Sequence, residues 1–81
     1  MKILINGSTS GLGKKIAEYY SRKKVSLICL GKNKQKIALL KKKVGLENLF
    51  FALDLSIDKN LNYLKSKVKD IKDIDAVIHC M

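Results

Sequence analysis

The sequence predicts an α/β fold in which parallel strands alternate with helices. Four short apolar runs, at residues 2–6, 25–30, 49–53 and from 76 onward, have the near-continuous hydrophobicity of strands that are covered on both faces. The three segments between these runs carry apolar side chains at helical spacing. Strands that alternate with helices of about 10 to 15 residues imply a parallel sheet joined by right-handed crossovers.

The first helix is expected over residues 12–23, with Leu12, Ile16 and either Tyr19 or Tyr20 on its buried side. The opposite side of this segment is charged, as it should be on a helix that packs against a sheet.

The second helix is expected over residues 34–44, where Gly45 provides the stop. Its buried stripe should consist of Ile37, Leu40 and Val44. In the third helix, Ser56 or Asp58 can act as the N-cap. The apolar residues of this helix recur at intervals of three, four and three: Leu61, Leu64, Val68 and Ile71.

Length and composition indicate one globular domain over residues 1–81, with no proline, linker or internal repeat. Hydrophobic residues make up 47% of the chain and charged residues 30%, which excludes a disordered chain. No apolar run approaches the roughly 18 residues of a membrane span, and the start of the chain leads into a strand rather than a signal peptide. We therefore expect a cytoplasmic protein with no membrane partner.

The net charge of +10 comes almost entirely from scattered lysines. A basic surface can bind nucleic acid, but lysines can equally form solvated helix faces. The second interpretation is favoured, because the aromatic residues, 6% of the chain, are not interleaved with the basic ones as a base-stacking surface requires. Nucleic acid is therefore not the expected partner.

The two cysteines, Cys29 and Cys80, have neither metal-ligand nor redox-motif spacing. The strand order given below places them two strands apart, about 9.5 Å, which exceeds the reach of a disulfide. They are expected to be free thiols inside buried strands.

The most informative segment is the loop at residues 6–14, which reads N-G-S-T-S-G-L-G-K between the first strand and the first helix. Gly7 can take the tight turn, Gly11 lets a ligand approach the backbone, and Gly13 lets the helix pack closely on the strand. Amide groups and the positive end of the helix dipole would then hold a phosphate. Thr9, Ser10 and Leu12 complete the expected binding loop.

Three other segments should meet this loop, because ligands of open parallel sheets bind outside the carboxyl ends of the strands. They are the turn at 31–33, the Asp54-Leu55 pair and residues 79–81.

These residues resemble the short-chain dehydrogenase/reductase family, whose first turn reads T-G-x-x-x-G-x-G. Asn6 takes the place of the threonine, and Gly7, Gly11 and Gly13 match. Asp54-Leu55 is similar to the family's Asp-Val pair, and residues 74–78 are similar to the approach to its N-N-A-G segment. The resemblance covers the whole chain. It implies a truncated, three-layer Rossmann-type fold of four parallel strands in order 3-2-1-4 with three crossover helices, and an NAD(P)-dependent oxidoreductase that transfers hydride between carbonyl and alcohol.

The resemblance also implies roles for single residues. Asp54 would accept from the adenine amino group, although an acid here can equally be a turn residue. His79 stands at the start of the family's Asn-Asn-Ala-Gly segment, which reads His79-Cys80-Met81 in this chain, and is carried over as a candidate cofactor contact.

Charge at the end of the second strand favours NADP over NAD. An NAD-binding protein usually places a carboxylate there for the ribose 2′-hydroxyl, whereas a 2′-phosphate requires positive charge. This chain has Lys32 and Asn33 there, with no acid nearby in the sequence, and Lys14 adds a cation beside the loop.

No catalytic residue and no metal ligand is assigned. By resemblance, catalysis would need a serine and a tyrosine with a lysine four residues on, in a segment beyond the fourth strand. The pairs Tyr20–Lys24 and Tyr63–Lys67 have that spacing but lie in crossover helices. We therefore expect an N-terminal cofactor-binding fragment whose fourth strand is an open edge that can self-associate.

Other functions remain open: a P-loop phosphotransferase, a basic nucleic-acid-binding module and a nucleotide sensor without catalysis. The P-loop pattern fits poorly, because five residues rather than four separate Gly7 from Gly13, and Lys15 replaces the magnesium-binding Ser or Thr.

Overall fold

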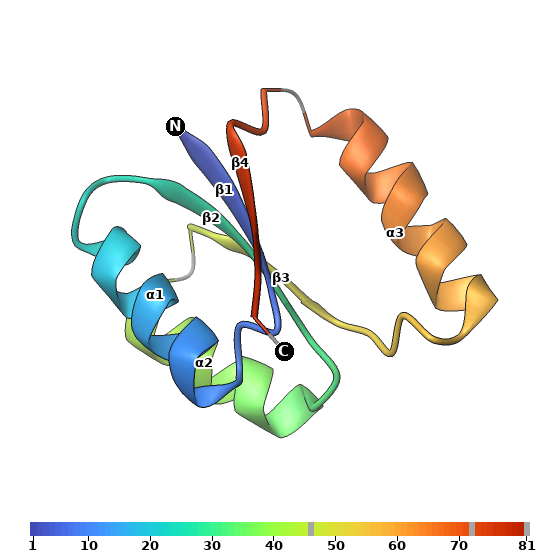
Figure 1. Ribbon diagram of the computed structural model, residues 1–81, viewed down its shortest axis with the longest axis horizontal. Coiled ribbons are helices and arrows are strands. Elements are labelled where there is room, and N and C mark those ends of the chain that lie inside the picture. The colour runs from blue at the N-terminus through green and yellow to red at the C-terminus, as the bar shows by residue number, and fades with distance from the viewer. Residues whose placement is uncertain (46, 72, 81) are drawn as a thin grey trace.

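The computed structural model describes residues 1–45, 47–71 and 73–80, and its centre is a parallel sheet (Figure 1). The strand order is β3-β2-β1-β4, which confirms the predicted order 3-2-1-4. The strands are β1 (Lys2–Asn6), β2 (Ser26–Gly31), β3 (Leu49–Ala52) and β4 (Ala76–His79). The register of the two central strands pairs Leu4 with Ile28, and β4 aligns with β1 so that Asn6 faces His79.

Helices cover both faces of this sheet, so the fold has the three predicted layers (Figure 1). Helices α1 (Gly11–Ser21) and α2 (Lys34–Val44) lie on one face, and α3 (Asp58–Asp70) lies on the other. The predicted bounds of α2 are confirmed. The side chain of Asn33 caps its start by accepting from the amide of Lys36, and Gly45 ends it with a φ of 105°.

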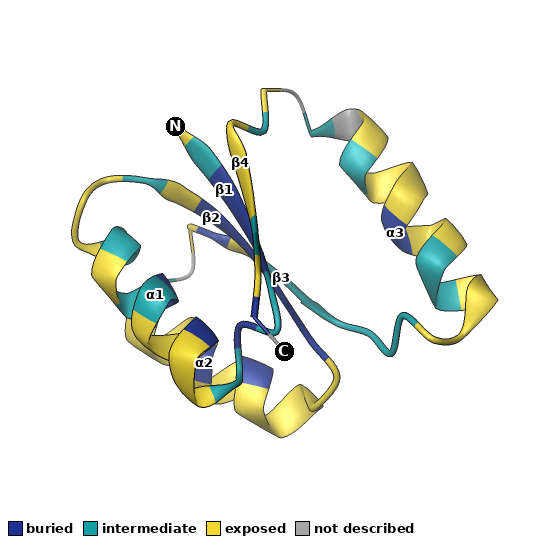
Figure 2. Cartoon of the chain, viewed as in Figure 1, coloured by how far each residue is buried: buried dark blue, intermediate teal, exposed yellow. Residues whose placement is uncertain are grey.

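The core follows the alternation of side chains along β1 and β2, which are the most buried strands (Figure 2). Ile5, Leu27 and Cys29 pack toward α1 and α2, while Ile28 and its neighbours pack toward α3. As predicted, Ile37, Leu40 and Val44 form the buried stripe of α2. Because both faces of the central strands are covered, each strand had to be apolar throughout.

Two sequence predictions about the helices are wrong. Leu12 was expected on the buried side of α1, but it is 65% exposed, and the buried residues of this helix are Gly13 and Ala17. Small residues face the sheet here because the helix start packs directly on the turn after β1. Neither Ser56 nor Asp58 caps α3, whose N-cap is Ile57, without a side-chain hydrogen bond.

Both cysteines are buried and free, as predicted. Burial raises the pKa of the Cys29 thiol to about 12, although a hydrogen bond with Ser8 opposes part of the rise. The thiol is therefore uncharged at neutral pH. Among the described residues, no helix is long and apolar enough to cross a membrane.

Candidate functional site

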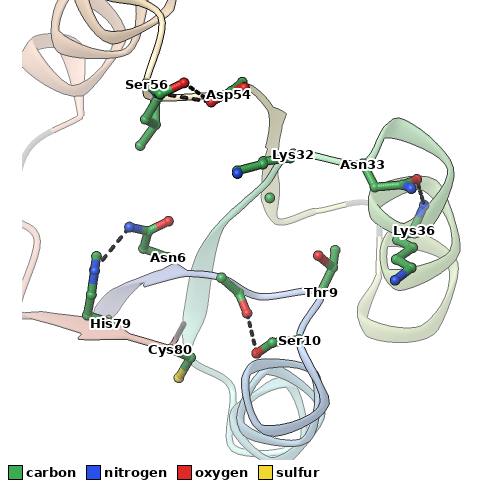
Figure 3. Close-up of a pocket in the computed structure, with 13 residues that line it drawn as sticks. Asn6, Thr9, Ser10, Lys32, Asn33, Lys36, Asp54, Ser56, His79 and Cys80 are labelled. Carbon is green, nitrogen blue, oxygen red and sulfur yellow. Dashed lines mark hydrogen bonds between the residues drawn. The ribbon is translucent and has the colours of Figure 1, made fainter.

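A cavity of about 630 Å³ opens at the carboxyl ends of the strands (Figure 3). The four segments predicted to meet do meet there, and this volume is typical of small-molecule sites. The sheet changes its direction of winding between β1 and β4, so the cavity lies where open parallel sheets bind their ligands. Its walls are formed by Asn6, Gly7, Thr9, Ser10, Gly31, Lys32, Asn33, Lys36, Asp54, Leu55, Ser56, His79 and Cys80.

The turn after β1 is fixed by hydrogen bonds to its own backbone and to β2. The amides of Gly7 and Ser8 both donate to the carbonyl of Leu30, at 3.1 and 2.9 Å. The hydroxyl of Ser10 donates to the carbonyl of Gly7 at 2.7 Å and accepts from the amide of Gly13 at 3.0 Å. The chain's own hydrogen bonds therefore define the conformation of this turn.

Some amides of this turn remain available. Those of Thr9, Gly11 and Leu12 donate to no acceptor in the described part of the chain. Gly11 and Leu12 are the first two residues of α1, where the positive end of the helix dipole adds to their attraction for an anion. The expected anion-binding amides are thus present, although Ser10 already occupies the amide of Gly13.

The glycines of the loop serve different purposes. Gly7 has a φ of +78°, and a Cβ there would overlap the backbone carbonyl of Cys80. A Cβ at Gly13 would overlap the carbonyl of Gly7, so α1 can pack on the turn only with glycine at this position. By contrast, a Cβ at Gly11 would meet no atom within 4 Å from the described residues outside its own helical turn. Packing among the residues that the structure describes therefore explains Gly7 and Gly13 but gives no reason for a glycine at position 11.

Asp54 lies at the opposite wall and is held by the residues that follow it. The amide and the hydroxyl of Ser56 donate to its Oδ1 at 3.0 and 2.7 Å. These two hydrogen bonds, the hydroxyl first, hold the pKa of the Asp54 carboxyl below its ordinary value, and the positive charge of Lys32 adds to this. Asp54 therefore acts as a turn residue and also presents a carboxylate to the cavity.

This arrangement corrects one premise of the cofactor prediction. No acid lies near Lys32 in the sequence, but the fold brings Asp54 close enough to interact with its charge. The fold also supplies a cation that the prediction missed, since Lys36, in the first turn of α2, lines the cavity. Lys14, expected beside the loop, is not part of the cavity wall and instead lines a groove of about 460 Å³ together with Lys36.

Eight of the eleven predicted site residues line the cavity: Gly7, Thr9, Ser10, Lys32, Asn33, Asp54, Leu55 and His79. Gly11, Leu12 and Gly13 do not line it and form the first turn of α1 behind the loop. Asn6, Gly31 and Cys80 also line the cavity; they belong to the predicted segments but were not assigned as single site residues. Lys36 and Ser56 line it without having been predicted. Met81, at the end of the predicted segment 79–81, lies outside the described residues.

Solved structures share this architecture. A short-chain dehydrogenase from Bacillus anthracis superposes with a TM-score of 0.83 at 19% identity, over 99% of this chain and 34% of its own. A protein assigned as a short-chain dehydrogenase from Shigella flexneri, crystallised with NADP, gives 0.78 at 28% identity, over 99% of this chain and 36% of its own. This confirms the resemblance to the short-chain dehydrogenase/reductase family.

A serine dehydrogenase from Escherichia coli adds a further case, with a TM-score of 0.82 at 20% identity over 95% of this chain and 36% of its own. The chain thus spans about a third of the length of these three dehydrogenases. No protein-family profile and no curated protein matches the sequence.

Proposed function

We propose that this chain is the dinucleotide-binding part of an NAD(P)-dependent oxidoreductase of the short-chain dehydrogenase/reductase type. The observation that carries the proposal is Gly11. Its amide is available at the start of α1, and no atom in the described part of the chain explains the absence of a side chain there. A phosphate that approaches this backbone closely would explain both facts. The Shigella flexneri structure with NADP supports the choice of ligand class.

Within this class, NADP is the proposed cofactor. Lys32 and Lys36 line the cavity beside Asn33, at the end of β2 where a 2′-phosphate would be recognised. Asp54 on the far wall lowers the net positive charge of the cavity. One oxygen of its carboxylate already accepts hydrogen bonds from Ser56. Two lysines against one acid still favour the more highly charged cofactor.

Titration calorimetry with NADP and NAD tests this proposal. NADP should bind more tightly, and Lys32→Ala and Lys36→Ala should each weaken NADP while leaving NAD nearly unchanged. Lys65→Ala, on an exposed position of α3 away from the cavity, is the matched control. Equal affinity for both cofactors would remove the argument from charge, and the absence of binding to either would remove the proposed function.

The catalytic groups are proposed to lie in a part of the enzyme that is not in this sequence. The pair Tyr63–Lys67 does not face the cavity; the ammonium of Lys67 instead lies 5.5 Å from the ring of Tyr63 on α3. Hydride transfer is accordingly proposed for a longer protein in which this segment supplies the cofactor site.

β4 lies at the edge of the sheet, and Val77 on it is 65% exposed. We propose that the present chain self-associates through this strand.

A further inference from the structure

Two polar side chains meet at the point where the sheet changes its direction of winding. Asn6 ends β1, His79 ends β4, and the register of the two strands places these residues opposite each other. Their positions in the sequence differ by 73 residues, so only the complete sheet brings them together. Because ligands of such sheets bind in the crevice at this point, the pair lies within the candidate site.

The geometry of the pair defines its hydrogen bond. Nδ2 of Asn6 lies 3.0 Å from Nδ1 of His79, and both residues line the cavity (Figure 3). With the Asn6 amide in this orientation, its nitrogen donates and Nδ1 of His79 accepts, because an amide nitrogen has no acceptor capacity. A neutral imidazole carries one proton on its two ring nitrogens, and that proton therefore resides on Nε2.

The nitrogen that carries this proton is available to a ligand. Nε2 of His79 has no hydrogen-bond partner in the described part of the chain, and the side chain is exposed. The cavity therefore contains an N–H donor whose tautomer is set by a neighbour. Its complement is an oxygen acceptor, which a dinucleotide offers in its pyrophosphate and in its ribose hydroxyls.

We propose that Asn6 is a positioning residue that holds His79 in its Nε2-protonated form. In that form Nε2–H donates to an oxygen of the bound dinucleotide, a step that rests on the proposed function. Asn6 acts through His79 and need not touch the ligand. Without Asn6 both tautomers become accessible, and in one of them Nε2 is an acceptor that faces an acceptor.

The first test reads the tautomer directly. His79 is the single histidine of the chain, so two-bond nitrogen–proton correlation spectra of the labelled protein report one imidazole without overlap. The ligand-free protein should show the Nε2-protonated tautomer at a pH where the ring is neutral, and Asn6→Leu should convert it into a mixture. A wild-type ring protonated on Nδ1 would overturn the inference without any reference to ligand binding.

The second test measures affinity by a double-mutant cycle with NADP as the ligand. Asn6→Leu and His79→Met should each weaken binding about 2- to 10-fold, the usual value of one hydrogen bond, and the double variant should lose no more than either single one. His79→Gln keeps a donor on the side chain and should restore most of the affinity. Asn62→Leu makes the same exchange on the exposed side of α3 and should change nothing. Backbone spectra of each variant establish that the fold is retained.

Shorter ligands identify the acceptor. A loss seen already with ADP assigns the hydrogen bond to the adenosine ribose or the phosphates, and a loss seen only with ADP-ribose assigns it to the distal ribose; either result supports the inference. If wild type binds NADP and both single variants bind equally well, the inference fails while the proposed function stands. If wild type binds neither NADP nor ADP-ribose, the proposed function is refuted, and so is the proposed hydrogen bond between His79 and the ligand.

Discussion

Alanine at Gly7 and alanine at Gly11 are expected to have opposite effects on stability, although both positions belong to one loop. At Gly7 the backbone is left-handed, with a φ of +78°, and the added Cβ would overlap the carbonyl of Cys80. The conformation costs about 1–2 kcal/mol, and forcing a methyl group into packed backbone costs about 1–3 kcal/mol more. Gly7→Ala should therefore lose about 2–5 kcal/mol of the roughly 4–12 kcal/mol expected for a domain of this size.

At Gly11, at the exposed start of α1, none of the described residues beyond that helical turn would contact the added Cβ. Removing the conformational freedom of glycine from the unfolded chain should stabilise the fold by about 0.4–1 kcal/mol. The same methyl group would obstruct a phosphate that approaches the Gly11 amide. Gly11→Ala should therefore be at least as stable as wild type while its affinity for ADP falls by about tenfold or more.

Urea unfolding followed by circular dichroism gives the stabilities, and calorimetry with ADP gives the affinities. In thermal unfolding, each kcal/mol should shift the Tm by about 4–8 °C for a domain of this length. The reasoning is refuted if Gly7→Ala unfolds at the wild-type midpoint. It is also refuted if Gly11→Ala keeps the wild-type affinity for ADP, because then no phosphate lies against this amide.

Three further predictions follow from buried or hydrogen-bonded groups. Asn48→Leu should cost about 1–3 kcal/mol, because the buried Asn48 accepts from the amide of Leu27 at 3.0 Å and that amide would lose its partner; a urea midpoint equal to that of wild type would contradict this. Ser56→Ala should raise the pKa of Asp54 toward its ordinary value, measured by carboxyl NMR. A carboxyl whose pKa is lower in the folded than in the unfolded state stabilises the fold at pH values above its unfolded-state pKa. Wild type should therefore be more stable than this variant at neutral pH, and the difference should disappear as the pH falls below about 3.8. The Cys29 thiol, with its pKa raised to about 12, should react with thiol reagents at pH 8 only after unfolding, as mass-spectrometric mapping of the modified cysteine would establish; modification of the native protein at the rate of a free cysteine would exclude this environment.

The sequence predicted an element best where residues at both of its ends mark the start and the stop. Helix α2 lies at its predicted residues because Asn33 provides a cap and Gly45 takes a positive φ. Helix α1 was harder, since the periodicity of apolar residues placed Leu12 inside. This helix is positioned by the absence of a side chain at Gly13. A pattern of hydrophobic residues does not show where a small side chain is needed for close packing.

The start of α3 was predicted wrongly for a different reason. Ser56 has the right chemistry for an N-cap, but its hydroxyl and its amide are both used to hold Asp54. Two local motifs compete for the same residue, and the sequence alone does not reveal which of them forms.

The location of the candidate site was predictable, because carboxyl ends of parallel strands always share one edge of the sheet. Lys36 could have been found as well, since it lies one helical turn beyond Lys32 and Asn33. The contact between Asn6 and His79 could not, because it depends on the register of β1 against β4 and no local pattern encodes that register.

The walls of the cavity come from segments as distant in the chain as Asn6 and Cys80. An unfolded chain cannot offer this surface, so an occupant binds the native form alone and shifts the unfolding equilibrium by mass action. At a concentration one hundred times its Kd, the occupant would add about 2.7 kcal/mol to the free energy of unfolding. For a chain of 81 residues that increment is large, and the abundance of the occupant in the cell would then determine how long each molecule resists proteolysis.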